Sequence, residues 1–293
     1  MRGFSLETRI NVLANKYGFH FRKNLGQNFL INESILDDIV ATADLTKDIP
    51  ALEIGPGMGF LTEKLADAAG FVTAVEIDPQ LVALLRDLYK DEENIIIRQD
   101  DALKLNFAAV AAETAEHGVT GEFKIVANLP YYITTPLLFH FLDNSPYWSE
   151  MVLMVQKEVA DRIVAAAGSK DYGVLTLMVA YDAEAEKVLT VPASSFRPRP
   201  NVDSAVIRLT KRAAPPCEVR DKSLFKAVVK AGFGQRRKTL ANALTNGGLG
   251  LTKTQVEELL KGNNIDPKRR GETLNFEEFA NLANALYSLK AQI

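Results

Sequence analysis

A glycine-rich segment near residue 55 is the first place where residue types and spacing indicate ligand chemistry. It reads E-I-G-P-G-M-G over 53–59 and is followed at once by a helical pattern over 60–68. Glycines there let the backbone turn tightly and approach a ligand at the amino end of a helix. Because Phe60 stands where a dinucleotide fingerprint has its third glycine, the spacing disfavours a pyrophosphate. Glu53 instead suits a cationic ligand, such as the amino acid end of a sulfonium nucleoside.

Two further carboxylates follow at regular intervals along the chain. The sequence V-E-I-D at 75–78 places Glu76 where the diol of a ribose needs an acceptor, and Asp101 in Q-D-D-A at 99–102 could hold the exocyclic amine of adenine. Each residue also has a purely structural interpretation, Glu76 as a solvated carboxylate at a strand end and Asp101 as a helix cap. Three acidic residues in order, each at the end of a successive predicted strand, favour a nucleoside site.

The sequence N-L-P-Y over 128–131 is a candidate for the chemical step. The amine of adenine is a poor nucleophile, because its lone pair is conjugated into the ring. The side-chain oxygen of Asn128 and a main-chain carbonyl could accept its two protons, while Tyr131 stacks on the base. Such a site works by orientation and electrostatics, without a general base before attack. The structural alternative is an ordinary turn.

A proline-stiffened loop over 195–204 presents Phe196 as a second stacking partner for a flipped base. Arg197 and Arg199 in the same loop could touch phosphates. The alternative interpretation is a rigid hairpin loop with a buried phenylalanine.

These residues require a sheet whose strands end side by side. Apolar runs predict strands at 51–54, 71–76, 95–98, 123–127 and 151–156, with helical patterns between them. Such alternation predicts an α/β fold with a mainly parallel sheet and ligands at the carboxyl ends of its strands. The stretches 175–191 and 204–209 are rich in β-forming residues, which predicts an antiparallel hairpin at one edge of the sheet.

Helical segments are predicted at both ends of the chain. A capped helix runs from Ser5 to Tyr17 and stops at Gly18. Four more helices are expected at 222–233, 237–245, 252–261 and 275–289. We therefore expect a first domain over 1–212, which includes the N-terminal helical arm, and a smaller all-helical domain over 213–293.

Charge is distributed unevenly over the 293 residues, whose formal net charge is −3. Between Lys211 and Leu240 there are nine basic residues and only two acidic ones, Glu218 and Asp221, which predicts a basic second domain that binds phosphates. The alternative interpretation is a solvated basic helix face. The N-terminal arm adds a second basic stretch, which predicts an RNA contact there. Its basic residues up to Leu30 are Arg2, Arg9, Lys16, Arg22 and Lys23.

Composition excludes several classes of protein. Cys217 is the single cysteine and there are three histidines, so we expect neither a disulfide nor a metal site. The longest apolar runs are too short to span a bilayer and the start M-R-G is polar, so we expect a cytoplasmic protein without membrane contact. We also expect a monomer.

The motifs together resemble those of the ribosomal RNA adenine dimethyltransferases, and most closely the bacterial small-subunit branch. They are N-L-G-Q-N-F-L at 24–30, the loop at 53–59, N-L-P-Y at 128–131, F-R-P-R-P-N-V-D-S at 196–204 and F-G-Q-R-R-K at 233–238. The resemblance implies a class I methyltransferase fold and the donor S-adenosyl-L-methionine, with S-adenosyl-L-homocysteine as product. It also implies dimethylation of two adjacent adenines near the 3′ end of 16S ribosomal RNA in immature small subunits.

The resemblance assigns roles to individual residues. The cofactor contacts that it implies are Asn28, Leu30, Gly55, Glu76, Asp101 and Asn128. The contacts to the target amine and base are Asn128, Leu129, Tyr131 and Phe196. Asn28 and Leu30 enter through the resemblance alone, whereas the residue chemistry had already indicated most of the others.

Three alternatives remain at this point. An enzyme that dimethylates large-subunit RNA and confers antibiotic resistance has a similar core, but the basic C-terminal domain favours the small-subunit branch. A nicotinamide-dependent oxidoreductase is disfavoured by the glycine spacing. A non-catalytic assembly factor is disfavoured, as the sole role, by the presence of Asn128 and Tyr131.

Overall fold

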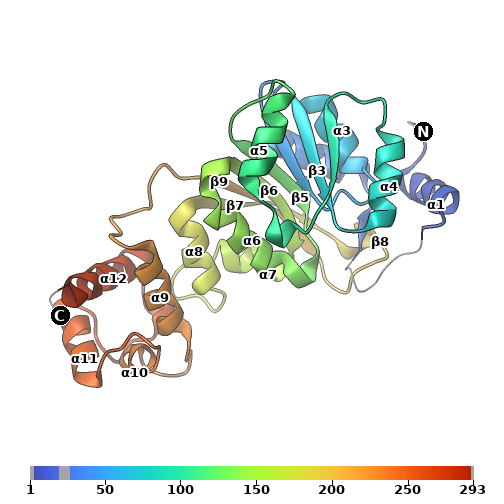
Figure 1. Cartoon of the computed structure of the whole chain (residues 1–293). Helices are drawn as coiled ribbons and strands as arrows, with labels where there is room; N and C mark the ends of the chain where they lie inside the picture. The colour runs from blue at the N-terminus through green and yellow to red at the C-terminus, as the bar shows by residue number, and fades with distance from the viewer. Residues whose placement is uncertain (1–2, 20–26, 292–293) are drawn as a thin grey trace. The chain divides into compact units, whose positions relative to one another are not determined.

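The computed structural model describes residues 3–19 and 27–291, and the chain divides into two compact units (Figure 1). The first consists of Met1–Ala160 with Glu186–Lys211, and the second of Asp161–Ala185 with Arg212–Ile293. The domain boundary between residues 212 and 213 stays a prediction. In this division the segment Asp161–Ala185 groups with the late helices.

The first unit is built on a seven-stranded sheet with the order β4-β3-β2-β5-β6-β9-β7 (Figure 1). Its strands are β2 (Pro50–Ile54), β3 (Phe71–Glu76), β4 (Ile95–Gln99), β5 (Phe123–Asn128), β6 (Trp148–Gln156), β7 (Ala183–Val191) and β9 (Ser204–Lys211). The first five in spatial order are mutually parallel, and β9 runs antiparallel to β6. The predicted mainly parallel sheet with an antiparallel edge is thereby confirmed. A separate two-stranded sheet pairs β1 (Phe29–Leu30) with β8 (Phe196–Arg197).

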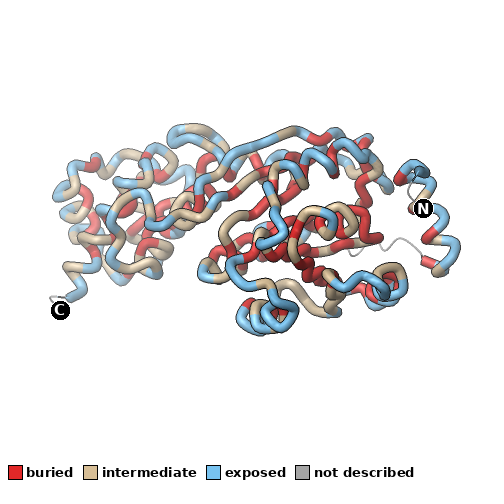
Figure 2. The backbone as a smooth tube through the Cα atoms, turned by 90° about the horizontal axis from the view of Figure 1, so that it is seen from above, coloured by how far each residue is buried: buried red, intermediate tan, exposed pale blue. Residues whose placement is uncertain are grey.

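The parallel strands are connected by α3 (Phe60–Ala68), α4 (Pro79–Leu88), α5 (Phe107–Glu116) and α6 (Thr134–Asp143), as crossover connections require. Helix α2 (Glu33–Ala43) precedes β2, and α7 (Lys157–Ile163) follows β6. Side-chain caps fix where several of them begin: Asp78 Oδ1 accepts the N–H of Gln80 at 3.0 Å, so α4 starts directly after β3. The buried segments, red in Figure 2, include all of β2 and β3.

The prediction of a strand over 175–182 is wrong. Residues Val174–Asp182 form the helix α8, and only Ala183–Val191 of the predicted stretch is a strand. An apolar run without clear periodicity fits a buried helix as well as a strand. Thr176 lies in the first turn of α8, where its hydroxyl accepts the backbone N–H of Gly173 at 3.2 Å and donates to the carbonyl of Arg162 at 2.6 Å.

The N-terminal helix α1 (Leu6–Tyr17) has the predicted cap at Ser5 and the left-handed stop at Gly18, with φ of 61°. The predicted RNA contact of Arg9 stays a prediction. Its guanidinium lies 2.5 Å from the carboxylate of Glu63 and 4.7 Å from the ring centre of Phe60, and its side chain is 11% exposed, so a phosphate would have to compete with these contacts. Lys16 lies on the surface, 3.3 Å from Asp87, while Arg2, Arg22, Lys23 and the motif residues 24–26 are outside the described residues.

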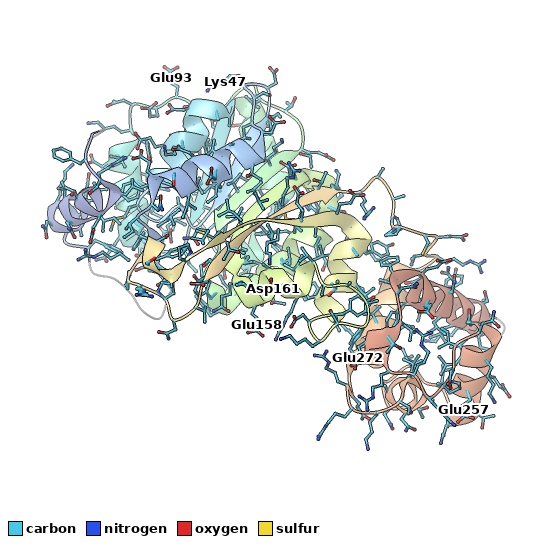
Figure 3. The ribbon with its side chains drawn as sticks, turned by 180° about the vertical axis from the view of Figure 1, so that it is seen from behind. Lys47, Glu93, Glu158, Asp161, Glu257 and Glu272 are labelled. Carbon is cyan, nitrogen blue, oxygen red and sulfur yellow. The ribbon has the colours of Figure 1, made fainter. Side chains whose placement is uncertain are left out.

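The second unit contains the four late helices of the prediction. They are α9 (Lys222–Phe233), α10 (Leu240–Thr245), α11 (Lys253–Gly262) and α12 (Phe276–Lys290). Helix α10 begins three residues later than predicted, with Thr239 as its N-cap. Glu272, labelled in Figure 3, accepts the backbone N–H of Gly168 at 2.7 Å through its carbonyl, and its carboxylate lies 3.8 Å from Arg236 Nε.

Candidate functional site

A cavity of about 340 Å³ lies at the carboxyl ends of β2, β3, β4 and β5. This volume falls in the range of small-molecule sites. It lies where the strand order reverses, since the chain runs outward from β2 to β4 and returns to pair β5 with β2. The predicted site residues that line it are Asn28, Leu30, Gly55, Glu76, Asp101, Asn128, Leu129 and Tyr131.

The glycine-rich loop forms one wall of the cavity. Gly55, Gly57 and Gly59 all have positive φ, and α3 begins directly after Gly59. A Cβ atom at Gly57 would lie 2.8 Å from the ring of Phe29, and one at Gly59 would lie 2.6 Å from the hydroxyl of Tyr89. Glycine is therefore required at both positions by backbone conformation and by space.

Glu53 is buried behind this loop and lines the cavity, with 1% of its surface exposed. Its Oε2 atom has no hydrogen-bond partner among the residues that the structure describes. Burial raises the pKa of this carboxyl to about 8; the neighbouring hydroxyl of Thr62 opposes the shift, and the nearby charge of Glu76 adds to it. A buried acceptor without a partner is suited to a ligand that brings its own donor or positive charge.

Glu76 is held rigidly at the end of β3. Its Oε1 atom accepts the backbone N–H groups of Ile77 and Asp78, each at 2.9 Å, and Oε2 accepts that of Gly57 at 3.3 Å. It is 6% exposed, so the interpretation as a solvated carboxylate is excluded. Burial raises its pKa, although these three hydrogen bonds oppose the shift. A carboxylate fixed in this way presents its remaining lone pairs to the cavity.

Asp101 lies across the cavity, at the start of a short 3₁₀ helix over Ala102–Lys104. Its Oδ1 atom accepts the backbone N–H of Leu103 at 3.0 Å, so the helix-cap interpretation holds as well as the location in the site. Sequence reasoning missed Ile77, an apolar side chain that is 51% exposed and lines the same cavity. Its position directly after Glu76 was the available signal, because an exposed apolar side chain beside a predicted ribose acceptor offers a face to a base.

Asn128 ends β5 and is oriented by a residue far away in the sequence. Its Nδ2 atom donates to the backbone carbonyl of Asn28 at 3.1 Å. Because the amide nitrogen is engaged there, the side-chain oxygen is the group left to accept a proton from a ligand. The adjacent Leu129 is 1% exposed and its N–H donates to the carbonyl of Met154 at 3.0 Å, which fixes the main chain of the motif to β6.

The two tyrosines of this motif differ in their surroundings. Tyr131 is half-buried, and its hydroxyl lies 2.6 Å from Ser204 Oγ on β9. Burial raises the pKa of Tyr131, so its hydroxyl stays protonated. Tyr132, which sequence reasoning did not single out, lines the cavity with 57% of its surface exposed.

Phe196 does not line the cavity. It is 3% exposed and its backbone pairs with that of Leu30 in the small β1–β8 sheet. Leu30 does line the cavity, so Phe196 pairs with a residue of the cavity wall without belonging to the wall itself. Its role as second stacking partner stays a prediction.

The described residues contain neither a metal-binding cluster nor a membrane-spanning helix. Over 3–19 and 27–291 there is no group of three or more His, Cys, Asp or Glu side chains that could hold a metal ion. Within the same ranges, none of the helices combines the length and apolar character that crossing a membrane demands.

Comparison with known proteins gives concordant results. The family model of ribosomal RNA adenine dimethylase matches residues 18–283. A protein of Geobacillus kaustophilus named ribosomal RNA small subunit methyltransferase A is 50% identical over 283 residues, covering 96% of each chain. A Bacillus mycoides protein of the same name is 46% identical over 288 residues, covering 98% of each chain.

Two solved structures share the architecture over most of the chain. A dimethyladenosine transferase from Plasmodium falciparum aligns with a TM-score of 0.69 and 28% identity, covering 87% of this chain and 95% of that one. The 23S rRNA methyltransferase ErmE aligns with a TM-score of 0.65 and 29% identity, covering 88% of this chain and 99% of the other.

Proposed function

The chain belongs to the ribosomal RNA adenine dimethylase family, and from this membership we propose that it dimethylates N6 of two adjacent adenines near the 3′ end of 16S ribosomal RNA. S-adenosyl-L-methionine is the proposed methyl donor, and the immature small subunit is the proposed substrate. The observation that carries the proposal is a single cavity that joins Glu53, Glu76 and Asp101 to the amide of Asn128. The first three suit a cationic adenosine derivative, and the last suits an amine that is to be alkylated.

The cavity fits S-adenosyl-L-methionine on the chemistry of its walls. Glu76 would accept hydrogen bonds from the ribose hydroxyls, and Asp101 would accept one from the exocyclic amine of the adenine. Ile77 would pack against the adenine ring. The unpartnered oxygen of Glu53 would face the positively charged amino acid end across the glycine loop. When bound, the donor supplies a methyl group on a sulfonium, which is a strong electrophile.

The residues of the N-L-P-Y motif would orient the target. The Asn128 oxygen accepts a hydrogen bond from one N–H of the N6 amine, and the Leu129 carbonyl accepts one from the other N–H. Both bonds favour a pyramidal nitrogen with its lone pair directed at the methyl group. Tyr131 stacks on the base. The methylated amine is a cation that loses its proton readily, so none of these residues has to act as a base before attack.

The small-subunit assignment rests on the relatives that are most similar among those compared. Proteins named for the small subunit are 46–50% identical over nearly the whole chain, whereas ErmE, named for 23S rRNA, is 29% identical. We place the protein in the cytoplasm, where small subunits of bacteria are assembled. The basic second unit would contact RNA phosphates, and its salt dependence of binding would report the number of contacts.

The test is methylation of immature small subunits that lack the modification, with large subunits alongside. We expect label from radioactive S-adenosyl-L-methionine to appear as N6,N6-dimethyladenosine in small-subunit RNA only. Asn128→Ala is the matched control, and it should bind small subunits without transferring label. Label in large-subunit RNA would overturn the small-subunit assignment, and tight binding of subunits by the wild type without any label would overturn the catalytic role.

A further inference from the structure

We propose that Ser204 is a positioning residue for the target adenine, acting through the hydroxyl of Tyr131. The inference rests on the proposed function, since it assumes that Tyr131 stacks on the base. It assigns a role in substrate orientation to the first residue of β9, which lies outside the cavity wall.

The contact between the two hydroxyls is short and protected. The oxygen atoms of Tyr131 and Ser204 are 2.6 Å apart, and Ser204 is 0% exposed. A hydrogen bond shielded from water holds its partners more firmly than one on the surface, because water cannot replace either of them. The Tyr131 ring is therefore fixed at its hydroxyl end as well as at its backbone.

Ser204 is itself held by the sheet and by the preceding residue. It stands opposite Gln156 in the antiparallel register of β6 and β9. The carbonyl of Asp203 accepts the N–H of Lys157 at 2.9 Å, and Asp203 Oδ1 accepts the N–H of Ala193 at 2.9 Å. The Ser204 hydroxyl therefore has a fixed position relative to β6, the strand that pairs with the Asn128 strand.

Fixing the ring affects how the base is received. Tyr131 follows Pro130 in a short 3₁₀ turn that lines the cavity, and its neighbour Tyr132 is 57% exposed. Without an anchor, a partly exposed aromatic side chain has several rotamers, and binding a base would have to select one of them. A ring that is already in place avoids that loss of entropy and keeps the amine within reach of Asn128.

A double-mutant cycle with Ser204→Ala and Tyr131→Phe tests the proposal. Each single variant removes one hydroxyl and keeps the Tyr131 ring, so each should lower kcat/KM for immature small subunits by about 3- to 10-fold, the value of one hydrogen bond. The double variant should be no worse than Tyr131→Phe alone, because both changes break the same contact. Affinity for S-adenosyl-L-methionine, measured by calorimetry, should stay unchanged in all three.

Thr73→Val is the matched control, since it also removes a buried hydroxyl from this sheet. Its Oγ1 atom lies 3.2 Å from that of Thr114, away from the cavity lining. It should lower the midpoint of thermal unfolding about as much as Ser204→Ala does, with no change in kcat/KM well below that midpoint.

Different results would refute the positioning role of Ser204 and the proposed methyltransferase function. A wild type that methylates while Ser204→Ala matches it in kcat/KM overturns the positioning role, as do additive effects in the double variant. If Ser204→Ala does not fold, Tyr131→Phe alone decides, because a full wild-type rate for that variant also overturns the role. A wild type that transfers no methyl to any subunit refutes the proposed function instead.

Discussion

Replacing Glu53 by glutamine tests whether this buried carboxyl keeps its proton in the folded protein. Glu53 is 1% exposed, and burial raises its pKa to about 8 from an ordinary value of 4.5. The unfolded chain releases this proton as the pH rises above 4.5, whereas the folded protein holds it up to about pH 8, so the wild type loses stability across that window. At about 1.4 kcal/mol for each pH unit, the loss reaches roughly 3 kcal/mol at pH 7 as an upper limit.

Glutamine has nearly the same shape and does not titrate. The free energy of unfolding of Glu53→Gln should therefore exceed that of the wild type by up to about 3 kcal/mol at pH 7, and by less than about 1 kcal/mol at pH 5. Urea unfolding at pH 5, 7 and 8.5 measures both values. Glu116→Gln is the control for the loss of one carboxyl group, because Glu116 lies exposed on α5.

A stability difference that is the same at pH 5 and pH 8.5 would refute the reasoning, and so would a variant less stable than the wild type at pH 8.5. Calorimetry on the same variant tests the proposed ligand. Loss of a carboxylate facing a cation should weaken S-adenosyl-L-methionine binding by about 10- to 100-fold at pH 8.5.

Three further changes probe other parts of the first unit. Gly57→Ala places a Cβ 2.8 Å from the Phe29 ring at a φ of +60°, so urea unfolding should show a loss of about 1–2 kcal/mol; an unchanged stability would contradict this geometry. Asn128→Ala should slow single-turnover methylation at least about 100-fold, with a much smaller change in S-adenosyl-L-methionine affinity by calorimetry; equal losses would make it chiefly a cofactor contact. Arg9→Ala breaks the contact with Glu63 and should destabilise the fold by about 1–3 kcal/mol, while a lower salt slope of subunit binding would support the predicted RNA contact of Arg9.

The sheet could be predicted from sequence wherever a strand is a short apolar run with turn residues at its ends. The predicted strand over 71–76 coincides with β3 for this reason. The strand prediction over Val174–Asp182 was wrong because the apolar residues there have no strong periodicity. The local pattern therefore cannot distinguish a buried helix from a buried strand. The tertiary environment decides that this segment is a helix, including the hydrogen bond from the Thr176 hydroxyl to the carbonyl of Arg162.

Some residues of the site could be predicted from the sequence and others could not. Glu76, Asp101 and Asn128 could be identified because each follows an apolar strand, and parallel strands bring their carboxyl ends to one edge. Ser204 could not, since its contact with Tyr131 joins residues 73 positions apart and depends on β9 lying antiparallel to β6. The burial of Glu53 behind the loop is likewise a result of packing and not of local pattern.

The antiparallel return of β9 also sets an order of events during synthesis. Every described residue that lines the cavity lies between Gln27 and Met154, although Phe29 and Leu30 pair with Arg197 and Phe196, which are made later. Ser204 is added fifty residues later, and only then does Tyr131 gain its anchor. Because chains emerge from the ribosome N-terminus first, the residues that line the cavity are made before the hydroxyl that anchors Tyr131.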